Sequence, residues 1–124
     1  MARLEEFEDI ESWKKAYAVT VQIYKLTEAG EFSRDFGLRD QIRRASVSIM
    51  ANIAEGYGRK SNTEFANFLN IARGSSHEAQ SHLHIALGLG YLKREDFDEL
   101  YNSLAEISRL TLGLAKYLRG HQKK

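Results

Sequence analysis

The chain has 124 residues, of which 43% are hydrophobic and 28% charged, as is typical of one globular domain with its own core. Cysteine is absent, which excludes disulfides and thiolate metal sites, and proline is absent, which favours long uninterrupted helices. The net charge of +1 does not by itself indicate a nucleic-acid partner. No stretch approaches the roughly 18 apolar residues of a membrane span, and the acidic start of the chain lacks the apolar core of a signal peptide. We therefore expect a soluble, cytoplasmic protein without a membrane partner.

The first helix is predicted over about residues 9–29, where aromatic and aliphatic residues share one face and Gly30 follows as a left-handed cap. The next loop carries Phe32 and Phe36, which we expect to close one end of the core. The second helix, about 38–57, is apolar over most of its circumference, which predicts burial on most sides. Gly56 or Gly58 is predicted to end it with a positive φ.

The third helix, about 62–90, begins at a predicted capping box, in which Ser61 caps the helix and Glu64 reaches back to the serine N–H. Its apolar positions alternate by four and three residues, which indicates a heptad seam whose small members let a neighbouring helix approach closely. The seam comprises Phe65, Leu69, Ala72, Ser76, Ala79, Leu83, Ala86 and Gly90. The fourth helix, about 95–118, repeats this spacing.

These elements predict an all-α fold, an antiparallel up-down-up-down four-helix bundle that spans residues 1–124 as one domain. One apolar stripe per helix would fill its core, yet the second, third and fourth helices carry more than one. Because apolar surface of that extent marks an interaction site, the pattern predicts homo-oligomerisation.

Charge is uneven along the chain. Acidic residues crowd the start, at Glu5, Glu6, Glu8, Asp9 and Glu11, and basic residues occupy the end, at Arg109, Lys116, Arg119, Lys123 and Lys124. In an up-down-up-down bundle the two groups lie at the same pole, where we expect them largely to neutralise each other.

Five other cations are the strongest candidates for contacts to nucleic-acid phosphates: Arg43, Arg44, Arg59, Lys60 and Arg73. Arg43 and Arg44 point about 100° apart on a helix, so at most one shares a face with Arg59 or Arg73. The alternative is structural, with Arg43 or Arg44 paired to a carboxylate within or between subunits. The carboxylates available for such pairs are Glu55, Glu64 and Glu78.

Asn52 and Glu55 lie on or beside the buried stripe of the second helix, so both require hydrogen-bond partners. We expect Glu55 to accept from an arginine or a helix N-terminus, and we group Asn52, Glu55, Glu64 and Glu78 as a structural polar network. General acid–base catalysis by a pair of carboxylates is not possible for a lone carboxylate. We therefore predict no catalytic residue and do not expect the chain to be an enzyme.

The third helix carries His77, His82 and His84 together with Glu78, residue types that can bind a metal ion. Glu78 and His82 share a face, but a metal site in a helix bundle takes ligands from several helices, and no other helix offers them. We predict neither a metal nor a cofactor.

The segments FGLRDQIRRASVSIMANIAEGYGRKS, EFANFLNIARGSSHEAQSHL and IALGLGYL resemble the bacterial four-helix-bundle proteins encoded in 23S rRNA intervening sequences. The resemblance covers about residues 13–117. That family is similar to the accessory variability determinant of diversity-generating retroelements, a ring-like homopentamer that binds nucleic acid and reverse transcriptase. Members of the family commonly have proline at the positions where this chain has Ser33 and Met50. The retroelement proteins are strongly basic, whereas the net charge of this chain is +1.

The resemblance implies a homopentameric bundle without enzymatic activity, whose partners are RNA or DNA and a reverse transcriptase or other protein. Together with the residues, it favours a non-enzymatic, nucleic-acid-binding homo-oligomer. The alternative is an assembly scaffold that binds another protein and has no affinity for nucleic acid.

Overall fold

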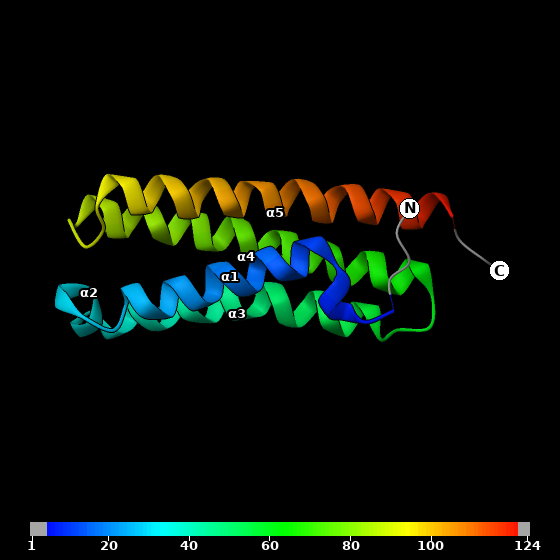
Figure 1. The fold of residues 1–124 in the computed structure, drawn as a ribbon, viewed down its shortest axis with the longest axis horizontal. Helices are drawn as coiled ribbons and strands as arrows, with labels where there is room; N and C mark the ends of the chain where they lie inside the picture. Colours follow the sequence, from blue (N-terminus) through cyan, green and yellow to red (C-terminus); the bar gives the residue numbers. More distant parts are fainter. Residues whose placement is uncertain (1–4, 122–124) are drawn as a thin grey trace.

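Four long helices form the body of the protein in the computed structural model, which describes residues 5–121 (Figure 1). They are α1 (Glu11–Leu26), α3 (Phe36–Tyr57), α4 (Asn62–Gly88) and α5 (Arg94–Gly120). A 3-10 helix, η1 (Phe7–Asp9), precedes α1, and a one-turn helix, α2 (Gly30–Arg34), precedes α3. The prediction of an all-α chain with four long helices is confirmed, and none of the described residues lies in a strand.

The long helices lie side by side, and the turns that join them fall at alternate ends (Figure 1). The largest contacts are those of α4 with α5 and of α3 with α4, while α1 packs on both α3 and α5. Each helix therefore has two helical neighbours around a shared core. Among residues 5–121, none of the helices combines the length and the hydropathy that a membrane span requires.

The predicted seam of α4 is confirmed, since its members from Phe65 to Ala86 are all buried and only Gly90 is exposed. Small residues at four of these positions allow α4 to pack closely between α3 and α5. Buried hydroxyls in the core, such as those of Thr20 and Thr111, donate to the carbonyl oxygen four residues earlier in their own helices. These two buried hydroxyl groups are therefore hydrogen-bonded although they lie in the core.

The end of α1 differs from the prediction. The helix ends at Leu26 instead of residue 29, and α2 follows in what was predicted to be a loop. Gly30 does adopt the expected positive φ of 69°, but at the first residue of α2. Phe32 is buried and stacks on Tyr91 with 5.3 Å between ring centroids, as expected of a residue that closes the core. Phe36 is 63% exposed, so the same prediction was wrong for it.

The prediction for the two glycines at the end of α3 was also wrong. Of the described residues only Gly30 and Gly90 have positive φ, while Gly58 is right-handed at −78°. Gly56 is needed for a different reason, because a Cβ there would lie 2.7 Å from the Cβ of Phe68. This glycine lets α3 and the first turns of α4 approach each other just before the turn that joins them.

Candidate nucleic-acid interface

The five cations predicted to contact phosphates do not form one patch, because the fold places them in three regions. Arg43 and Arg44 lie in the first half of α3, Arg59 and Lys60 in the turn between α3 and α4, and Arg73 in the middle of α4. Fourteen residues of helix separate Arg43 from the end of α3, which corresponds to about 21 Å.

Arg43 holds α1 to α3. Its Nε donates to Thr27 Oγ1 at 2.8 Å, and its guanidinium lies 4.5 Å from the centre of the Tyr24 ring. Arg44 points elsewhere, as the helical spacing predicted, and is exposed and without an ion pair in the described chain. The structural role predicted for one of these arginines therefore falls to Arg43, but its partners are a hydroxyl and an aromatic ring in place of the expected glutamate.

At the α3–α4 turn, Arg59 is occupied while Lys60 is free. Arg59 Nη2 donates to Glu55 Oε2 at 2.8 Å, and its guanidinium lies 4.8 Å from the centre of the Phe68 ring. The expectation that an arginine would satisfy Glu55 is therefore confirmed. Lys60 is exposed and forms no ion pair within residues 5–121.

The residues grouped as a structural polar network do not join one another. Asn52 donates to the carbonyl and hydroxyl oxygens of Ser48, whose hydroxyl lies 2.9 Å from that of Ser75 across the α3–α4 contact. The other three make separate local contacts: Glu55 with Arg59, Glu64 with Ser61 and Glu78 with His82. Only the Asn52 group links two helices, so the network prediction was wrong as a single unit.

Ser61 caps α4 as predicted, since its hydroxyl oxygen accepts from the backbone N–H of Glu64 at 3.1 Å. The second half of the predicted capping box differs. The Glu64 carboxylate receives the serine hydroxyl at 3.3 Å in place of the serine N–H.

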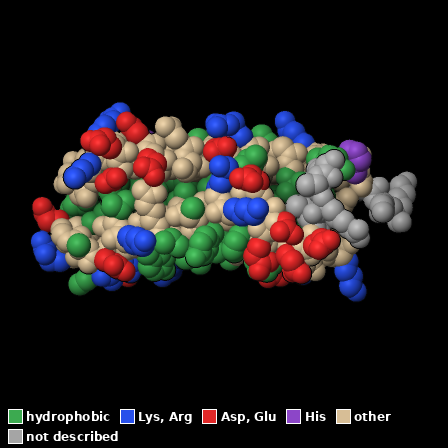
Figure 2. Space-filling model, viewed as in Figure 1, with side chains coloured by type: hydrophobic (Ala, Val, Ile, Leu, Met, Phe, Trp, Pro, Cys, Tyr) green, Lys and Arg blue, Asp and Glu red, His purple; other side chains and the backbone are tan. Residues whose placement is uncertain are grey.

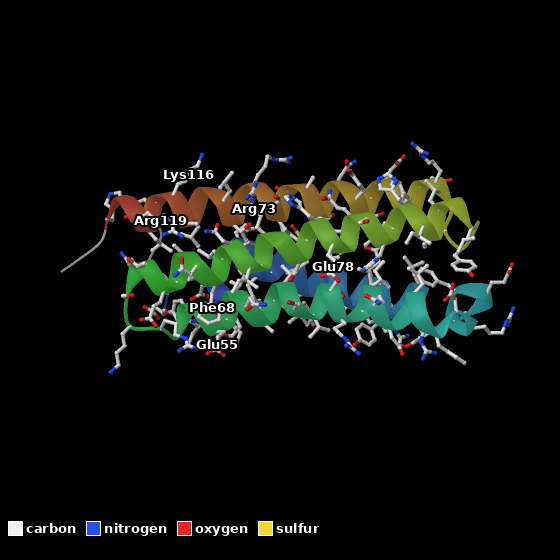
Figure 3. All side chains as sticks on the ribbon, turned by 180° about the vertical axis from the view of Figure 1, so that it is seen from behind. Glu55, Phe68, Arg73, Glu78, Lys116 and Arg119 are labelled. Carbon is white, nitrogen blue, oxygen red and sulfur yellow. The ribbon has the colours of Figure 1, made fainter. Side chains whose placement is uncertain are left out.

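The remaining cation, Arg73, lies at the contact between α4 and α5. Two hydrogen bonds set the register of these helices, His77 Nε2 to Ser108 Oγ and Arg119 Nη2 to Asn67 Oδ1. Residues 67–77 of α4 consequently run antiparallel beside residues 108–119 of α5, over about 15 Å. Figure 3 shows Arg73, Lys116 and Arg119 in the same half of this helix pair.

We call the cations of this region the α4–α5 basic face: Arg73, Arg109, Lys116 and Arg119. Three of them are exposed, and Arg73 is half-buried with an Nε that has no hydrogen-bond partner. No aspartate or glutamate occurs in residues 65–77 or 107–121, and none of the four cations forms an ion pair in the described chain. Their positive potential is therefore not cancelled locally.

The acidic start of the chain lies on another side of the bundle. η1 packs on α1 and α3, and Figure 2 shows its carboxylates gathered at one end of the face opposite that of Figure 3. No ion pair within residues 5–121 joins these carboxylates to the basic face. The expected neutralisation at a common pole is thus replaced by a separation of charge around the bundle. Lys123 and Lys124, which belonged to that expectation, lie outside the described residues.

Sequence reasoning had singled out Arg73 and, separately, the basic end of the chain, but it did not join them. The available signal was the absence of carboxylates from two segments that face each other in antiparallel helices. Only the register between α4 and α5 turns that absence into a continuous surface.

The histidines of α4 do not build a metal centre among the described residues. His82 Nε2 lies 3.5 Å from Glu78 Oε2, and no third histidine, aspartate or glutamate joins a group that could hold an ion. His84 instead packs edge-on against the rings of Phe97 and Tyr101. His84, like His77 with its hydrogen bond to Ser108, therefore contributes to the contact between α4 and α5, whereas His82 pairs within α4.

The sequence profile of the 23S rRNA-intervening sequence protein family matches residues 8–113. Among solved structures, the chain is similar to a protein of unknown function from the S23 ribosomal protein family of Bacteroides thetaiotaomicron. The two are 28% identical, with a TM-score of 0.78, over 85% of this chain and 95% of that one. No curated protein matches the chain. The chain belongs to the 23S rRNA-intervening sequence protein family.

Proposed function

We propose that this member of the 23S rRNA-intervening sequence protein family is a non-enzymatic, cytoplasmic homo-oligomer that binds nucleic acid, preferentially RNA. The observation that carries the proposal is the α4–α5 basic face, four cations over about 15 Å in two facing segments, residues 65–77 and 107–121, that contain no carboxylate side chain. Phosphate contacts supply most of the sequence-independent affinity for nucleic acid, and a partner of this kind suits a face of arginine and lysine. Local separation of charge reconciles such binding with a net charge of only +1.

Homo-oligomerisation is supported by apolar side chains on the outside of α4. Ile71, Ile85 and Leu89 are about half exposed and form a row that no helix of the described chain covers. A ring of identical subunits would repeat one modest basic face several times, and affinity rises steeply with the number of phosphate contacts. The resemblance favours a homopentamer. The fold of each subunit in this proposal is an antiparallel, up-down-up-down bundle, which is supported by the short connections and by Figure 1.

Of the five cations predicted to contact phosphates, Arg44 and Lys60 are exposed, form no ion pair in the described chain and lie outside the basic face, and they are proposed as secondary phosphate contacts. Arg43 and Arg59 are already bound to neighbouring groups within the bundle, and a phosphate would have to displace Glu55 to pair with Arg59. We therefore rank them below Arg44, Lys60 and Arg73.

The second candidate function is a scaffold that binds a reverse transcriptase or another protein and has no affinity for nucleic acid. The observation that favours it is an exposed apolar strip on α1 and α3, which carries Tyr17, Val21, Tyr24 and Val47. Such surfaces usually mark protein interaction sites.

The test is fluorescence anisotropy of a labelled RNA stem against the protein at several salt concentrations. In the triple variant Arg73→Gln, Lys116→Gln, Arg119→Gln we expect affinity to fall and the salt slope to shrink by about 2 to 3. A control of equal charge changes Lys14, Lys25 and Lys93, which are exposed and unpaired in the described chain, to glutamine. Equal losses in the two variants would reject the basic face as the site, and no binding by the wild type would favour the scaffold.

A further inference from the structure

An apolar groove lies between η1, α1 and α3, on a different side of the bundle from the basic face. The groove has a volume of about 270 Å³ and is lined, among residues 5–121, by Phe7, Trp13, Val47, Met50, Ala51 and Ala54. Trp13 stacks on the half-exposed Tyr17, with 5.6 Å between ring centroids, and so extends the apolar surface along α1. Val47 lies both in this groove and beside Tyr24, further along the bundle.

We define the α1–α3 strip as this groove together with Tyr17, Val21 and Tyr24. From Trp13 to Tyr24 it follows α1 for about 16 Å, or three helical turns. On the face shown in Figure 2, green side chains gather along α3 beside α1, with charged side chains around them. Exposed aromatic and aliphatic residues at helical spacing are the surface into which the apolar face of another helix fits.

The η1 end of the strip is strongly acidic. Glu5, Glu6, Glu8 and Asp9 are exposed, and none of them pairs with a lysine or arginine within residues 5–121. The Asp9 carboxylate accepts the backbone N–H groups of Glu5 and Glu6, which closes this turn, and the Phe7 ring packs edge-on against Trp13 of α1. The carboxylates are therefore held beside the groove and, in Figure 2, border the apolar patch.

We infer that the α1–α3 strip docks an amphipathic helix of a partner protein, with the helix's apolar side chains in the groove and its lysines or arginines over the carboxylates near η1. At the η1 end of the strip, charge complementarity favours a basic segment of that helix, because like charges facing each other would oppose docking.

A second copy of this chain fits the strip less well through the apolar row on its α4. Its other row of exposed apolar residues, Ile71, Ile85 and Leu89, lies on α4, where the only lysine or arginine is Arg73 at the α5 contact. A two-fold pairing of two strips would set the η1 carboxylates of each against Arg43 and Arg44 of the other, which is complementary in charge, and the light scattering below tests this pairing separately. The inference deepens the second candidate function, on which it rests, because it names the kind of partner that the strip takes, and it does not depend on nucleic-acid binding.

The test uses a synthetic amphipathic helix of about 18 residues made of leucine and lysine, with a leucine–glutamate helix as its counterpart. Trp13 is the only tryptophan of the chain and lines the groove, so its emission reports occupancy directly. We expect the lysine peptide to shift this emission and to bind at least about tenfold more tightly than the glutamate peptide. Equal binding of the two peptides, or no emission change, would overturn the inference.

Two matched double variants locate the site. Tyr17→Asn with Val47→Asn removes exposed apolar groups from the strip, and Ile71→Asn with Ile85→Asn makes the same kind of change on α4. We expect the strip pair to weaken the lysine peptide by about tenfold and the α4 pair to leave it within about twofold. Equal weakening would reject the strip as the site.

The molar masses of the two double variants without peptide, measured by light scattering, distinguish docking of a partner from self-association of the chain. Docking of a partner on the strip requires that the strip pair keep the molar mass of the wild type. A lower molar mass for the strip pair alone would make the strip a contact between subunits, and would overturn the inference while leaving the nucleic-acid proposal intact.

Discussion

Gly56 shows how a single residue can determine the distance between two helices. Its missing Cβ leaves room for Phe65 and Phe68 of α4, whose atoms would lie 3.0 Å and 2.7 Å from a methyl group at this position. Sequence reasoning identified the glycine but assigned it to a positive φ, because a glycine at a helix end is most often a cap. Close approach of another helix has no local signature in the sequence.

A first prediction compares Gly56→Ala with Gly74→Ala. We expect the Gly56 variant to lose about 1–3 kcal/mol of unfolding free energy, because the added methyl group overpacks the α3–α4 contact. Gly74 lies on the exposed face of α4 with nothing within 4 Å, so alanine there should stabilise by about 0.5–1 kcal/mol. Urea unfolding measures both, and a Gly56 variant as stable as the Gly74 variant would contradict the described contact.

A second prediction concerns Tyr91, whose hydroxyl donates to Asp35 Oδ2 at 3.0 Å. The hydrogen bond to Asp35, followed by burial and by the charges of Asp35 and Glu31, raises the pKa of Tyr91 above its ordinary value. Because the folded pKa is raised, the contribution to stability is complete below the unfolded pKa of about 10 and is lost as pH rises through the folded value. In Tyr91→Phe, the free energy of unfolding should therefore lack this decrease at alkaline pH.

Thermal unfolding of the wild type and of Tyr91→Phe between neutral and alkaline pH checks that sign. The difference in melting temperature should be largest near neutral pH and narrow as the pH rises above the ordinary tyrosine range. A difference that widens at alkaline pH would mean that the hydroxyl is not the donor to Asp35.

At the scale of the helices, the sequence predicted existence and type well and the role of individual polar residues poorly. The spacing of apolar residues gave the four long helices and the buried seam of α4, because burial and helical period leave a direct pattern in the chain. α2 was missed because a one-turn helix leaves too few periodic positions. The partners of polar side chains depend on which helices become neighbours. For Arg43 the sequence therefore predicted a glutamate, whereas its partners are the Thr27 hydroxyl and the Tyr24 ring.

A third prediction tests that role of Arg43. Arg43→Ala removes the hydrogen bond to Thr27 and the contact with the Tyr24 ring, and we expect it to cost about 1–2 kcal/mol of unfolding free energy. Arg44→Ala changes an exposed neighbour without an ion pair in the described chain and should stay within about 0.5 kcal/mol. Equal effects of the two variants in urea unfolding would show that Arg43 does not hold α1 to α3.

For the whole molecule, the arrangement of charge and apolar surface matters more than composition. A net charge of +1 conceals a basic face on α4 and α5 and an acidic end beside η1. The sequence indicated both groups of charges, but their separation around the bundle required the register of α4 against α5 and the packing of η1 on α1 and α3.

A fourth prediction concerns assembly. If the row on α4 lies between subunits, Ile71→Asn with Ile85→Asn should lower the molar mass measured by light scattering while helical content by circular dichroism stays unchanged. An unchanged molar mass would place the subunit contact elsewhere on the surface.

The most direct test of the central claim is light scattering coupled to size exclusion, with and without a structured RNA stem, at low and moderate salt. The proposal predicts an oligomer, of pentamer size by resemblance, whose peak moves to higher mass with RNA at low salt and less so at moderate salt. An oligomer indifferent to RNA at low salt, or a monomer at micromolar concentration, would contradict a nucleic-acid-binding assembly.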